Sequence, residues 1–348
     1  MSPDEVRGRR RRWLTAAEIL AGLIFASLCG WLTWHFYPQP ELPAGWQTIS
    51  IPQDVLALLE VGKQIWVGGI EGLAVIDGES GKLLYWVQAD VPLGFVNSLA
   101  SDGERIWVAH EQGISQYAAG NWQNLEIANR QPSCQVLDVY YGALSGLWIG
   151  TTCGLFHLAE SGWHFYSQAD GLAGSAVSVL LEDQRGDIWA GDGYSPLGGL
   201  SRFDGHSWSP VSSMGILAHN SVNAILETPR GDLWFGTGLG SRGGATLFDG
   251  DNWYSYYKSD GLAGERVRAM LFDRAGKLWL GSEVDGLAIF LQPGWLILTP
   301  KDGLAGWEIR AILQDEQKNI WLGTNRGLTR IQADAWLALV GDNRGAGK

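Results

Sequence analysis

A tryptophan-bearing motif that recurs seven times limits what this chain can fold into more than any other feature. In each copy the tryptophan follows Ile or Leu and precedes one apolar residue and then, usually, glycine. The seven tryptophans are Trp66, Trp107, Trp148, Trp189, Trp234, Trp279 and Trp321, separated by 41, 41, 41, 45, 45 and 42 residues. A period of this length indicates an array of repeated structural units.

Each unit divides into four strand-like segments joined by short turns. Around Trp189 we expect a first strand over 175–183, a turn over 184–187, and further strands over 188–191, 198–203 and 206–211. Such short connections make successive strands pair antiparallel, so each unit is a four-stranded meander. The composition agrees, because 48 glycines and 19 tryptophans with only 3 methionines favour short aromatic strands and tight turns over helices.

One such sheet cannot bury both of its faces. The tryptophan and the glycine two residues later point to the same side of the second strand, so the glycine leaves room beside the indole for a neighbouring sheet. Seven sheets around a common axis bury one another's faces, and a closed ring leaves no terminal sheet exposed. We therefore predict an all-β fold, a seven-bladed β-propeller of four-stranded antiparallel blades over residues 46–340.

Closure of this ring leaves two candidates for the last outer strand. A fourth-strand tryptophan occurs in six units, at Trp86, Trp122, Trp163, Trp208, Trp253 and Trp295. The seventh position belongs either to Trp46, before the first unit, or to Trp336, after the last. We favour Trp46, because GWQTIS at 45–50 resembles GWHFYS at 162–167 and because an N-terminal strand in the last blade would close the ring non-covalently. Trp336 remains the alternative.

The N-terminal segment has a different character. Five arginines from Arg7 to Arg12 precede a stretch, Ile19 to Trp34, that has no charged residue. As a helix, residues 19–37 span about 28 Å, close to the hydrocarbon thickness of a bilayer. We expect a cytoplasmic basic tail over 1–12, a single N-terminal transmembrane helix as signal anchor over 13–37, a Pro-rich linker over 38–45 and a C-terminal tail over 341–348, with the propeller outside the cytoplasm.

Two other interpretations of this segment are open. A cleaved secretory signal requires small residues at a site after the apolar run, and none is well placed. A lipoprotein signal would use Cys29, but Leu28 stands where such signals have Gly, Ala or Ser. We favour an uncleaved anchor, which leaves Cys29 within the membrane.

The charge balance bears on the partners of the chain. The formal net charge is −12, and all of the acidic excess lies beyond the arginine-rich tail, which is itself net positive. Because phosphate binding requires clustered Lys and Arg, this balance argues against a nucleic acid as partner.

Two Arg-Gly-Asp tripeptides, at 185–187 and 230–232, raise the question of cell adhesion. Both lie between the first and second strands of their units, where corresponding turns carry Arg-Ala-Gly-Lys or Glu-Gln-Lys-Asn instead. We therefore interpret both as hairpin turns in which glycine supplies the turn conformation.

At the level of individual residues the units resemble the repeats of the two-component regulator propeller family. The resemblance covers about residues 46–340 and is carried by Asp183, Gly186 and Trp189, by LWIGTTCGL around Trp148, and by the Asp-Gly-Leu connectors that begin at Asp170, Asp260 and Asp302. WD40 and kelch repeats fit less well, because the Trp-Asp pair and the kelch glycine doublet are missing.

The resemblance implies an extracytoplasmic sensor or ligand-recognition domain, commonly joined through a transmembrane helix to a histidine kinase, a cyclase or a DNA-binding regulator. Here about a dozen residues precede the expected anchor and eight follow residue 340. We therefore expect a membrane-anchored form without an output domain, whose signal passes to a separate membrane kinase or regulator, or else a propeller that only displays a binding surface.

Candidate ligand-binding residues follow from the strand alternation. The start of each first strand and the end of each second strand lie on one face of the ring, whose loops vary while the frame does not. Two long connectors on this face, 191–200 and 236–247, contain Tyr194 and Arg242. Near the axis, the residue after the first apolar position is Asn97, Ser178, Asn223, Arg268 or Arg310 in five blades.

From this face we select Tyr194, Asn223, Arg242, Arg268 and Arg310 as candidate ligand-binding residues. The two neighbouring arginines of an acidic domain could bind an anion. Ordinary salt bridges with acidic neighbours are the favoured interpretation of both.

Cysteine positions predict a disulfide. Cys134 begins the first strand of its blade and Cys153 follows the second strand, so antiparallel pairing brings both to the same rim. Outside the cytoplasm such thiols oxidise readily, and closing this short loop contributes about 3 kcal/mol in the chain-entropy model.

No motif indicates catalysis, a metal or a cofactor. The six histidines, His35, His110, His157, His164, His206 and His219, are scattered singly without metal-ligand spacing, and no nucleophile elbow, phosphate loop or calcium loop occurs. The leading hypothesis is a membrane-anchored extracytoplasmic propeller that senses a ligand or binds a protein. The alternatives are a propeller lyase or hydrolase, which would need a His, Asp or Glu cluster at the channel mouth, and a structural scaffold of a cell-envelope assembly.

Overall fold

The computed structural model describes residues 41–88, 93–211, 215–291 and 294–342. The expected basic tail, the expected anchor and most of the expected linker therefore lie outside the described residues. Among the residues described, no helix is long and apolar enough to cross a membrane. Apart from Glu41, the described residues belong to one compact unit that begins at Leu42.

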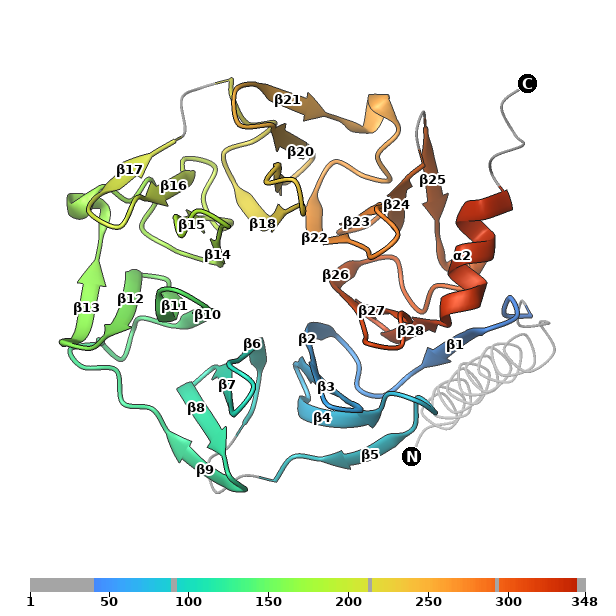
Figure 1. Cartoon of the computed structure of the whole chain (residues 1–348), viewed down its shortest axis with the longest axis horizontal. Helices are drawn as coiled ribbons and strands as arrows, with labels where there is room; N and C mark the ends of the chain where they lie inside the picture. The colour runs from blue at the N-terminus through green and yellow to red at the C-terminus, as the bar shows by residue number, and fades with distance from the viewer. Residues whose placement is uncertain (1–40, 89–92, 212–214, 292–293, 343–348) are drawn as a thin grey trace, which may run out of the picture. The chain divides into compact units, whose positions relative to one another are not determined.

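Seven four-stranded antiparallel sheets stand around a common axis in this unit (Figure 1). Blade 1 contains β2 (Val55–Val61), β3 (Gln64–Gly69), β4 (Gly72–Asp77) and β5 (Leu83–Trp86). Blade 2 contains β6 (Val96–Ser101), β7 (Arg105–His110), β8 (Gly113–Ala118) and β9 (Asn121–Asn124). Blade 3 contains β10 (Val136–Gly142), β11 (Gly146–Thr151), β12 (Gly154–Ala159) and β13 (Gly162–Tyr166).

The remaining blades repeat this order. Blade 4 contains β14 (Val179–Glu182), β15 (Ile188–Gly191), β16 (Leu200–Phe203) and β17 (Trp208–Pro210). Blade 5 contains β18 (Val222–Glu227), β19 (Leu233–Leu239), β20 (Arg242–Phe248) and β21 (Trp253–Tyr256). Blade 6 contains β22 (Val267–Phe272), β23 (Leu278–Ser282), β24 (Leu287–Phe290) and β25 (Trp295–Leu298). The predicted seven-bladed β-propeller of four-stranded antiparallel blades is confirmed.

Blade 7 combines the two ends of the propeller. It contains β26 (Ile309–Gln314), β27 (Ile320–Thr324), β28 (Gly327–Ile331) and, as its outer strand, β1 (Trp46–Ile49). Trp46 lies opposite Ile331 in this antiparallel pair. The preference for Trp46 over Trp336 is therefore confirmed, and the ring is closed by a strand from the start of the chain.

Trp336 lies on the helix α2 (Ala333–Asp342), so the alternative in which it supplies the last outer strand was wrong. Because β1 already occupies the edge of β28, the chain after Ile331 has no free strand edge there to pair with. Instead the Trp336 indole is buried against Trp279 of blade 6, with ring centroids 5.9 Å apart, and its Nε1 donates to the carbonyl oxygen of Lys318 at 2.8 Å.

The motif glycines allow the blades to approach one another. A Cβ added at Gly68 would lie 2.5 Å from Val96 Cγ1 of the next blade, and one added at Gly323 would lie 2.6 Å from Val55 Cγ1 across the closure of the ring. All seven second-strand tryptophans are buried between blades. The expected role of these glycines, to leave room for the neighbouring sheet, is thereby confirmed.

Side chains join the first and last blades at both ends of the first strands. Arg310 of β26 pairs with Asp54 at the start of blade 1, with Nη1 and Oδ1 3.1 Å apart. At the other end, the Glu60 carboxylate accepts the backbone N–H of Glu316 at 2.9 Å. The equivalent contact recurs where Glu227 accepts the N–H of Gln184 at 2.9 Å. The join between the two ends of the chain is therefore built like an ordinary contact between blades.

The Asp-Gly-Leu connectors form three short 3-10 helices, η1 (Gln168–Asp170), η2 (Lys258–Asp260) and η3 (Pro300–Asp302). In η3 the Asp302 carboxylate accepts the backbone N–H of Thr299, and Gly303 has a positive φ of 114°. Leu304 is then buried between blades 6 and 7. This element of the family pattern therefore shapes the connection between blades.

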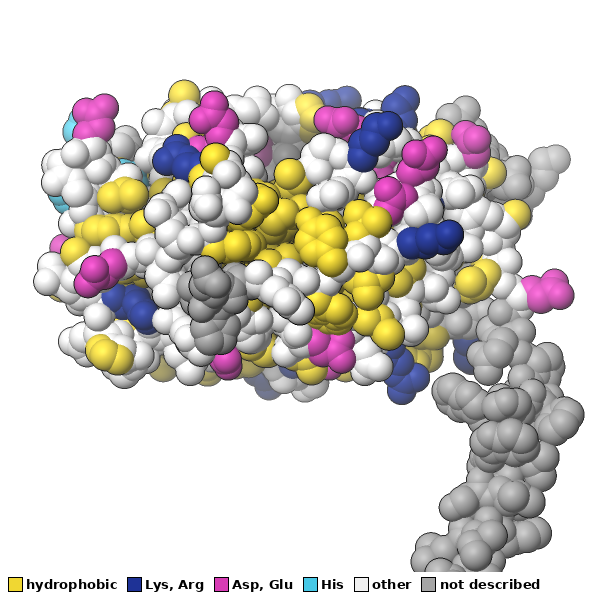
Figure 2. All heavy atoms as spheres, turned by 90° about the horizontal axis from the view of Figure 1, so that it is seen from below, with side chains coloured by type: hydrophobic (Ala, Val, Ile, Leu, Met, Phe, Trp, Pro, Cys, Tyr) yellow, Lys and Arg dark blue, Asp and Glu magenta, His cyan; other side chains and the backbone are white. Residues whose placement is uncertain are grey.

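The outer edge of the ring is partly apolar. Figure 2 shows hydrophobic side chains gathered on the edge that faces the viewer. On the outer strand β5, Leu83, Leu84 and Tyr85 are consecutive exposed residues. These positions lie at the outer edge of the ring, far from its central axis.

Candidate functional site

The first strand of each blade places one residue at one mouth of the central channel. These residues are Leu56, Asn97, Leu137, Ser178, Asn223, Arg268 and Arg310, and all seven line a cavity of about 390 Å³. We call this set the channel mouth, and we call the face on which the first strands begin the entry face. Five of the seven are the axial positions that the repeat alignment identified, and leucine occupies the other two blades.

A recurrent backbone irregularity places these side chains. In six blades the first strand has a register shift at this residue, between Val55 and Ala57 in blade 1 and at the equivalent positions of blades 2, 3, 5, 6 and 7. A β-bulge leaves one residue unpaired and changes the direction of its side chain. The preceding residue, such as Val55, stays buried between blades. The bulge thus lets two consecutive residues serve different surroundings: Val55 is buried between blades, and Leu56 lines the channel.

Both arginines of the channel mouth form salt bridges. Arg268 binds Glu283 through Nη2 at 2.7 Å, and Arg266 binds the other oxygen of Glu283 at 2.7 Å. Arg310 binds Glu308 at 2.8 Å, besides its contact with Asp54. Three guanidinium groups and three carboxylates therefore balance one another on one side of the mouth. This agrees with the favoured interpretation of Arg268 and Arg310, that both form ordinary salt bridges with acidic neighbours.

These contacts set the electrostatics of Arg310. Burial opposes its charged form, but the hydrogen bond that Arg310 donates to Glu308 and the charges of Glu308 and Asp54 outweigh burial and raise the pKa of Arg310. Arg310 is therefore a permanent cation with two anionic partners. An incoming anion would have to compete with both carboxylates.

Of the five predicted ligand-binding residues, the structure brings four together around the cavity: Tyr194, Asn223, Arg268 and Arg310. The Tyr194 side chain is 64% exposed at the rim. The Asn223 amide donates to the carbonyl oxygen of Gly238 at 2.9 Å. Arg242 does not line the cavity, because β19 and β20 continue as a hairpin in which it pairs with Leu239.

Sequence reasoning missed several lining residues. Leu56, Phe95, Leu137, Leu239 and Glu308 also surround the cavity. Leu56 and Leu137 occupy the same repeat position as the predicted polar residues, so the alignment of units could have included them. No sequence signal placed Phe95 or Glu308, because both lie on connectors between blades.

Exposed apolar side chains concentrate on the entry face. Its loops carry the exposed residues Ile51, Ile70, Phe95, Tyr194, Leu197, Val284 and Trp307. Among the described turns that join first to second strands, on the opposite face, the exposed large apolar residue is Leu144. Aromatic and apolar side chains around a polar cavity are typical of binding surfaces.

Below the mouth, the channel continues as a second cavity of about 300 Å³. Its lining includes the apolar residues Leu58, Leu99, Ile225, Met270 and Ile312, but most of the surface that it exposes to the cavity is polar. A single carboxyl group, that of Asp138, lies among the described residues at this level.

The histidines that the structure describes serve packing and hydrogen bonding away from the channel. His110 is buried with Nε2 3.0 Å from Ser115 Oγ, and His157 stacks on Trp148 with ring centroids 3.8 Å apart. Burial lowers the pKa of both imidazoles. Within the described ranges, no three His, Cys, Asp or Glu side chains lie close enough together to hold a metal ion.

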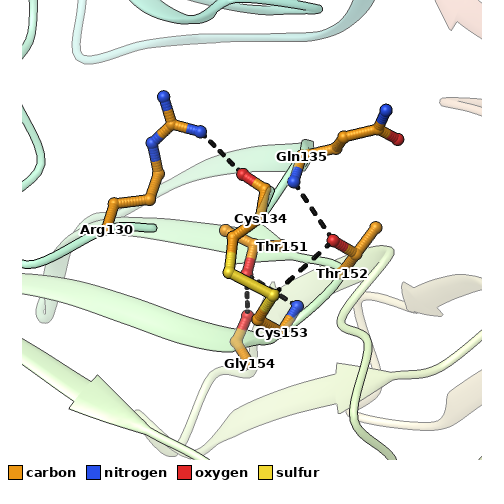
Figure 3. The surroundings of a disulfide bond; sticks show 7 residues. All are labelled: Arg130, Cys134, Gln135, Thr151, Thr152, Cys153 and Gly154. Atoms are coloured by element: carbon orange, nitrogen blue, oxygen red, sulfur yellow. Dashed lines mark hydrogen bonds between the residues drawn. A yellow bond between two sulfur atoms is a disulfide. The ribbon is translucent and has the colours of Figure 1, made fainter. Parts of the chain in front are cut away.

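A disulfide joins Cys134 to Cys153 on the entry-face rim of blade 3 (Figure 3). The two Cα atoms are 5.4 Å apart. Arg130 donates to the carbonyl oxygen of Cys134 at 2.6 Å, and the backbone N–H of Gln135 donates to Thr152 Oγ1 at 3.1 Å. The disulfide thus ties the connector before β10 to the turn that follows β11.

Fold and site together define a β-propeller with an open, aromatic-rimmed channel mouth. Three of its repeats match the model of the two component regulator propeller family, at residues 216–238, 261–283 and 305–326. Each match covers the first strand of one blade and all or nearly all of its second strand. The chain therefore carries two component regulator propeller repeats, which confirms the resemblance seen in its sequence. A comparison with curated protein sequences gives no match.

Solved structures share the fold at low sequence identity. The extracellular domain of BT3049 from B. thetaiotaomicron, assigned as a hybrid two component system, superposes with a TM-score of 0.72 and 19% identity. The alignment covers 85% of this chain and 42% of that domain, so the chain spans less than half of that relative's length.

Two further propellers show the range of proteins with this fold. YCF48 bound to D1 peptide has a TM-score of 0.62 and 18% identity, over 84% of this chain and 99% of that one. Virginiamycin B lyase from Staphylococcus aureus has a TM-score of 0.65 and 13% identity, over 82% of this chain and 98% of the lyase. At these identities the likeness concerns the fold.

Proposed function

We propose that this chain is an extracytoplasmic recognition module, a sensor or protein-interaction propeller, that binds its ligand at the channel mouth. The observation that carries the proposal is the cavity of about 390 Å³ at the six bulged first strands. Exposed apolar residues surround it on one face, while the opposite turns carry few. Ligand sites of propellers and barrels usually lie in such a cavity, at the end of the channel where the variable loops are.

The proposal includes the membrane anchor over 13–37 and transfer of the signal to a separate membrane kinase or regulator. The arginine-rich, then uncharged, N-terminal sequence favours an anchor, and the extracellular domain of an assigned two component system has the same fold. Binding to a partner protein is compatible with YCF48, whose structure was solved with a peptide.

The enzyme alternative has less support in the described part of the chain. The mouth carboxylates Glu283, Glu308 and Asp54 are each held by an arginine, and no described histidine lines the cavity. The scaffold alternative would be favoured by a partner that contacts the outer edge of the ring instead of the entry face.

Site-specific photo-crosslinking in membranes tests the proposal. A photoreactive residue at Tyr194 or Trp307 reports on the entry face, and the same residue at Leu144, which is 77% exposed, is the matched control on the opposite face. We expect a defined adduct at the two entry-face positions that the variant Arg268→Glu weakens. An adduct at Leu144 alone would contradict the proposal.

A further inference from the structure

One outer strand of the ring carries a run of exposed apolar side chains. Leu83, Leu84 and Tyr85 of β5 are consecutive, and each is between 38% and 48% exposed. β5 is the last strand of its sheet, and no strand among the described residues pairs with its outer edge. Successive side chains of a strand point to opposite faces, so neither face of this strand is fully covered. We call these three residues the β5 patch.

The β5 patch lies beside the point at which the chain enters the propeller. The turn before β5 packs against β1, because a Cβ added at Gly81 would lie 2.4 Å from Gln47 Oε1. Helix α2 packs against the residue before β1, because a Cβ added at Gly45 would lie 2.8 Å from Ala335 Cβ. Figure 1 shows β1, α2 and the start of β5 as neighbours at one side of the ring.

Other exposed apolar residues gather in the same region. Leu42, just before β1, and Leu337 of α2 are exposed. In contrast, the outer strands β9 and β17 of blades 2 and 4 carry no large exposed apolar side chain. Elsewhere on the described outer edge such residues are scattered and form no run of three, and they are Phe165, Tyr254, Tyr257 and Ile297. The outer edge is therefore most apolar where the chain enters the ring.

The charge around the β5 patch also differs from that of the rest of the chain. Over residues 81–88 the one charged side chain is that of Lys82, although the chain as a whole has a net charge of −12. The corresponding outer strand of blade 5 follows Asp249 and Asp251 instead. A cation followed by apolar and aromatic residues is typical of segments that lie at a membrane–water interface.

The distance to the expected anchor indicates which surface covers the β5 patch. Four residues, 38–41, separate the end of this anchor at residue 37 from Leu42. Pro38 and Pro40 are among them, and a proline-rich segment extends about 3.1 Å per residue, roughly 12 Å in all. An anchor over 13–37 would therefore hold the start of the propeller, and with it the neighbouring β5, within reach of the bilayer surface.

We propose that the β5 patch contacts the surface of the lipid bilayer. The outer edge of blade 1 then lies on the membrane, the channel axis runs along the membrane, and ligands reach the entry face from the side. This inference rests on the proposed function, which includes the anchor. The contact is shallow, because the outer edge of β5 presents backbone N–H and C=O groups that need water or lipid headgroups as partners. Leu84 and Tyr85 reach the boundary between headgroups and acyl chains, where interfacial segments lie.

Quenching of a fluorescent label by brominated lipids tests this contact in the full-length chain. The variant Leu84→Cys carries a bimane label in a Cys29→Ser background and is reconstituted into phosphatidylcholine vesicles. The matched control is the same label on Tyr254→Cys, because Tyr254 on the outer strand of blade 5 is 46% exposed and Leu84 is 47% exposed. We expect lipids brominated close to the headgroup to quench the label at position 84. Lipids brominated at the ends of the acyl chains should leave it bright, and neither lipid should quench the label at position 254.

A double variant assigns the quenching to the β5 patch. Leu83→Glu with Tyr85→Glu places a carboxylate on each side of the label, so we expect the quenching at position 84 to be lost. Both residues are exposed, and the melting temperature should therefore change little. Equal quenching at positions 84 and 254, or quenching at position 84 that persists in the double variant, would overturn the inference. Quenching by lipids brominated at the chain ends would contradict a shallow contact.

Failure of the anchor and failure of the contact give different results. A chain that does not float with the vesicles would contradict the anchor and the contact together. A chain that floats but shows no quenching at position 84 would overturn the contact and leave the anchor and entry-face binding intact. Unlabelled Leu84→Cys that forms a disulfide between two chains in the vesicles, without lipid quenching of the labelled form, would assign the β5 patch to a second copy and likewise overturn the inference.

Discussion

The indole Nε1 of Trp321 donates to Asp315 Oδ2 at 2.7 Å, with both residues fully buried in blade 7. The same bond joins Trp189 to Asp183 at 2.8 Å and Trp279 to Asp273 at 2.7 Å. The aspartate also accepts backbone N–H groups of the turn between first and second strands, as Asp315 does from Asn319. The paired Asp and Trp of the repeat are therefore one structural device that fixes the turn against the buried face.

We expect Asp315→Ala to lower the free energy of unfolding by about 2–3 kcal/mol, because the indole N–H, the Asn319 amide and the turn would lose a buried anionic acceptor. Chemical denaturation measures the change. The neighbouring variant Glu316→Gln, at an exposed position, should change the same free energy by less than about 0.5 kcal/mol. Equal losses of unfolding free energy in the two variants would show that the buried Asp315 carboxylate stabilises the fold no more than the exposed Glu316 carboxylate does.

Closure of the ring by β1 predicts that Trp46 is a major stabilising residue. Its indole packs with Leu298, Leu304 and Ile331 between blades 6 and 7. We expect Trp46→Ala to cost about 3–5 kcal/mol of unfolding free energy. Trp307→Ala is the matched control, since Trp307 is 41% exposed on the entry face, and its cost should stay below about 1 kcal/mol. A Trp46→Ala chain as stable as this control would contradict closure by β1.

The repeat made most of this fold predictable. A tryptophan and a glycine two residues apart define a strand that must face another sheet, and seven copies at nearly constant spacing leave little choice of architecture. The segment around Trp336 was harder, because a short apolar run such as Ala335 to Val340 fits a strand or a helix equally well. Only the occupied edge of β28 decides between the two.

The site was predictable in position but not in detail. The repeat alignment identified Arg268 and Arg310 as axial residues, whereas the bulges that direct them to the channel leave no mark in a pattern of alternating apolar residues. Arg242 was selected from a glycine-rich connector, and glycine content does not distinguish a loop from the tip of a long hairpin. Asp138 was not selected, because the repeat pattern does not show that its carboxylate accepts a hydrogen bond from Ser98 of the neighbouring blade.

The expected anchor predicts that the native chain behaves as an integral membrane protein. We expect it to remain in the membrane pellet after alkaline extraction, and the Cys134–Cys153 region to react with an impermeant thiol reagent only after reduction from the outside. A variant with Leu20, Leu23 and Ile24 changed to Lys should be released, because a charged side chain costs about 2.5–3.5 kcal/mol at the centre of a membrane helix. Retention of this variant would contradict an anchor over 13–37.

The disulfide predicts redox-dependent stability. Reduction should lower the free energy of unfolding by about 3 kcal/mol, because the cross-link restricts a loop of 19 residues in the unfolded chain. The double variant Cys134→Ser, Cys153→Ser should have this lower stability with or without reductant, whereas Cys29→Ser should respond like the native chain. A native chain whose denaturation midpoint ignores reductant would show that the cross-link has no net effect.

The channel carboxyl predicts an unusual dependence of stability on pH. Burial raises the pKa of Asp138 from 3.8 to about 6, so between these values the folded chain binds the proton more tightly than the unfolded chain does. Its contribution to stability is therefore present below pH 4 and is lost as the pH rises to 6, by about 3 kcal/mol. Asp138→Asn cannot ionise, so its free energy of unfolding should not show this loss. Between pH 4 and pH 7 the stability of the variant should therefore rise relative to that of the native chain. If both chains change in parallel over this range, Asp138 is not the group that titrates.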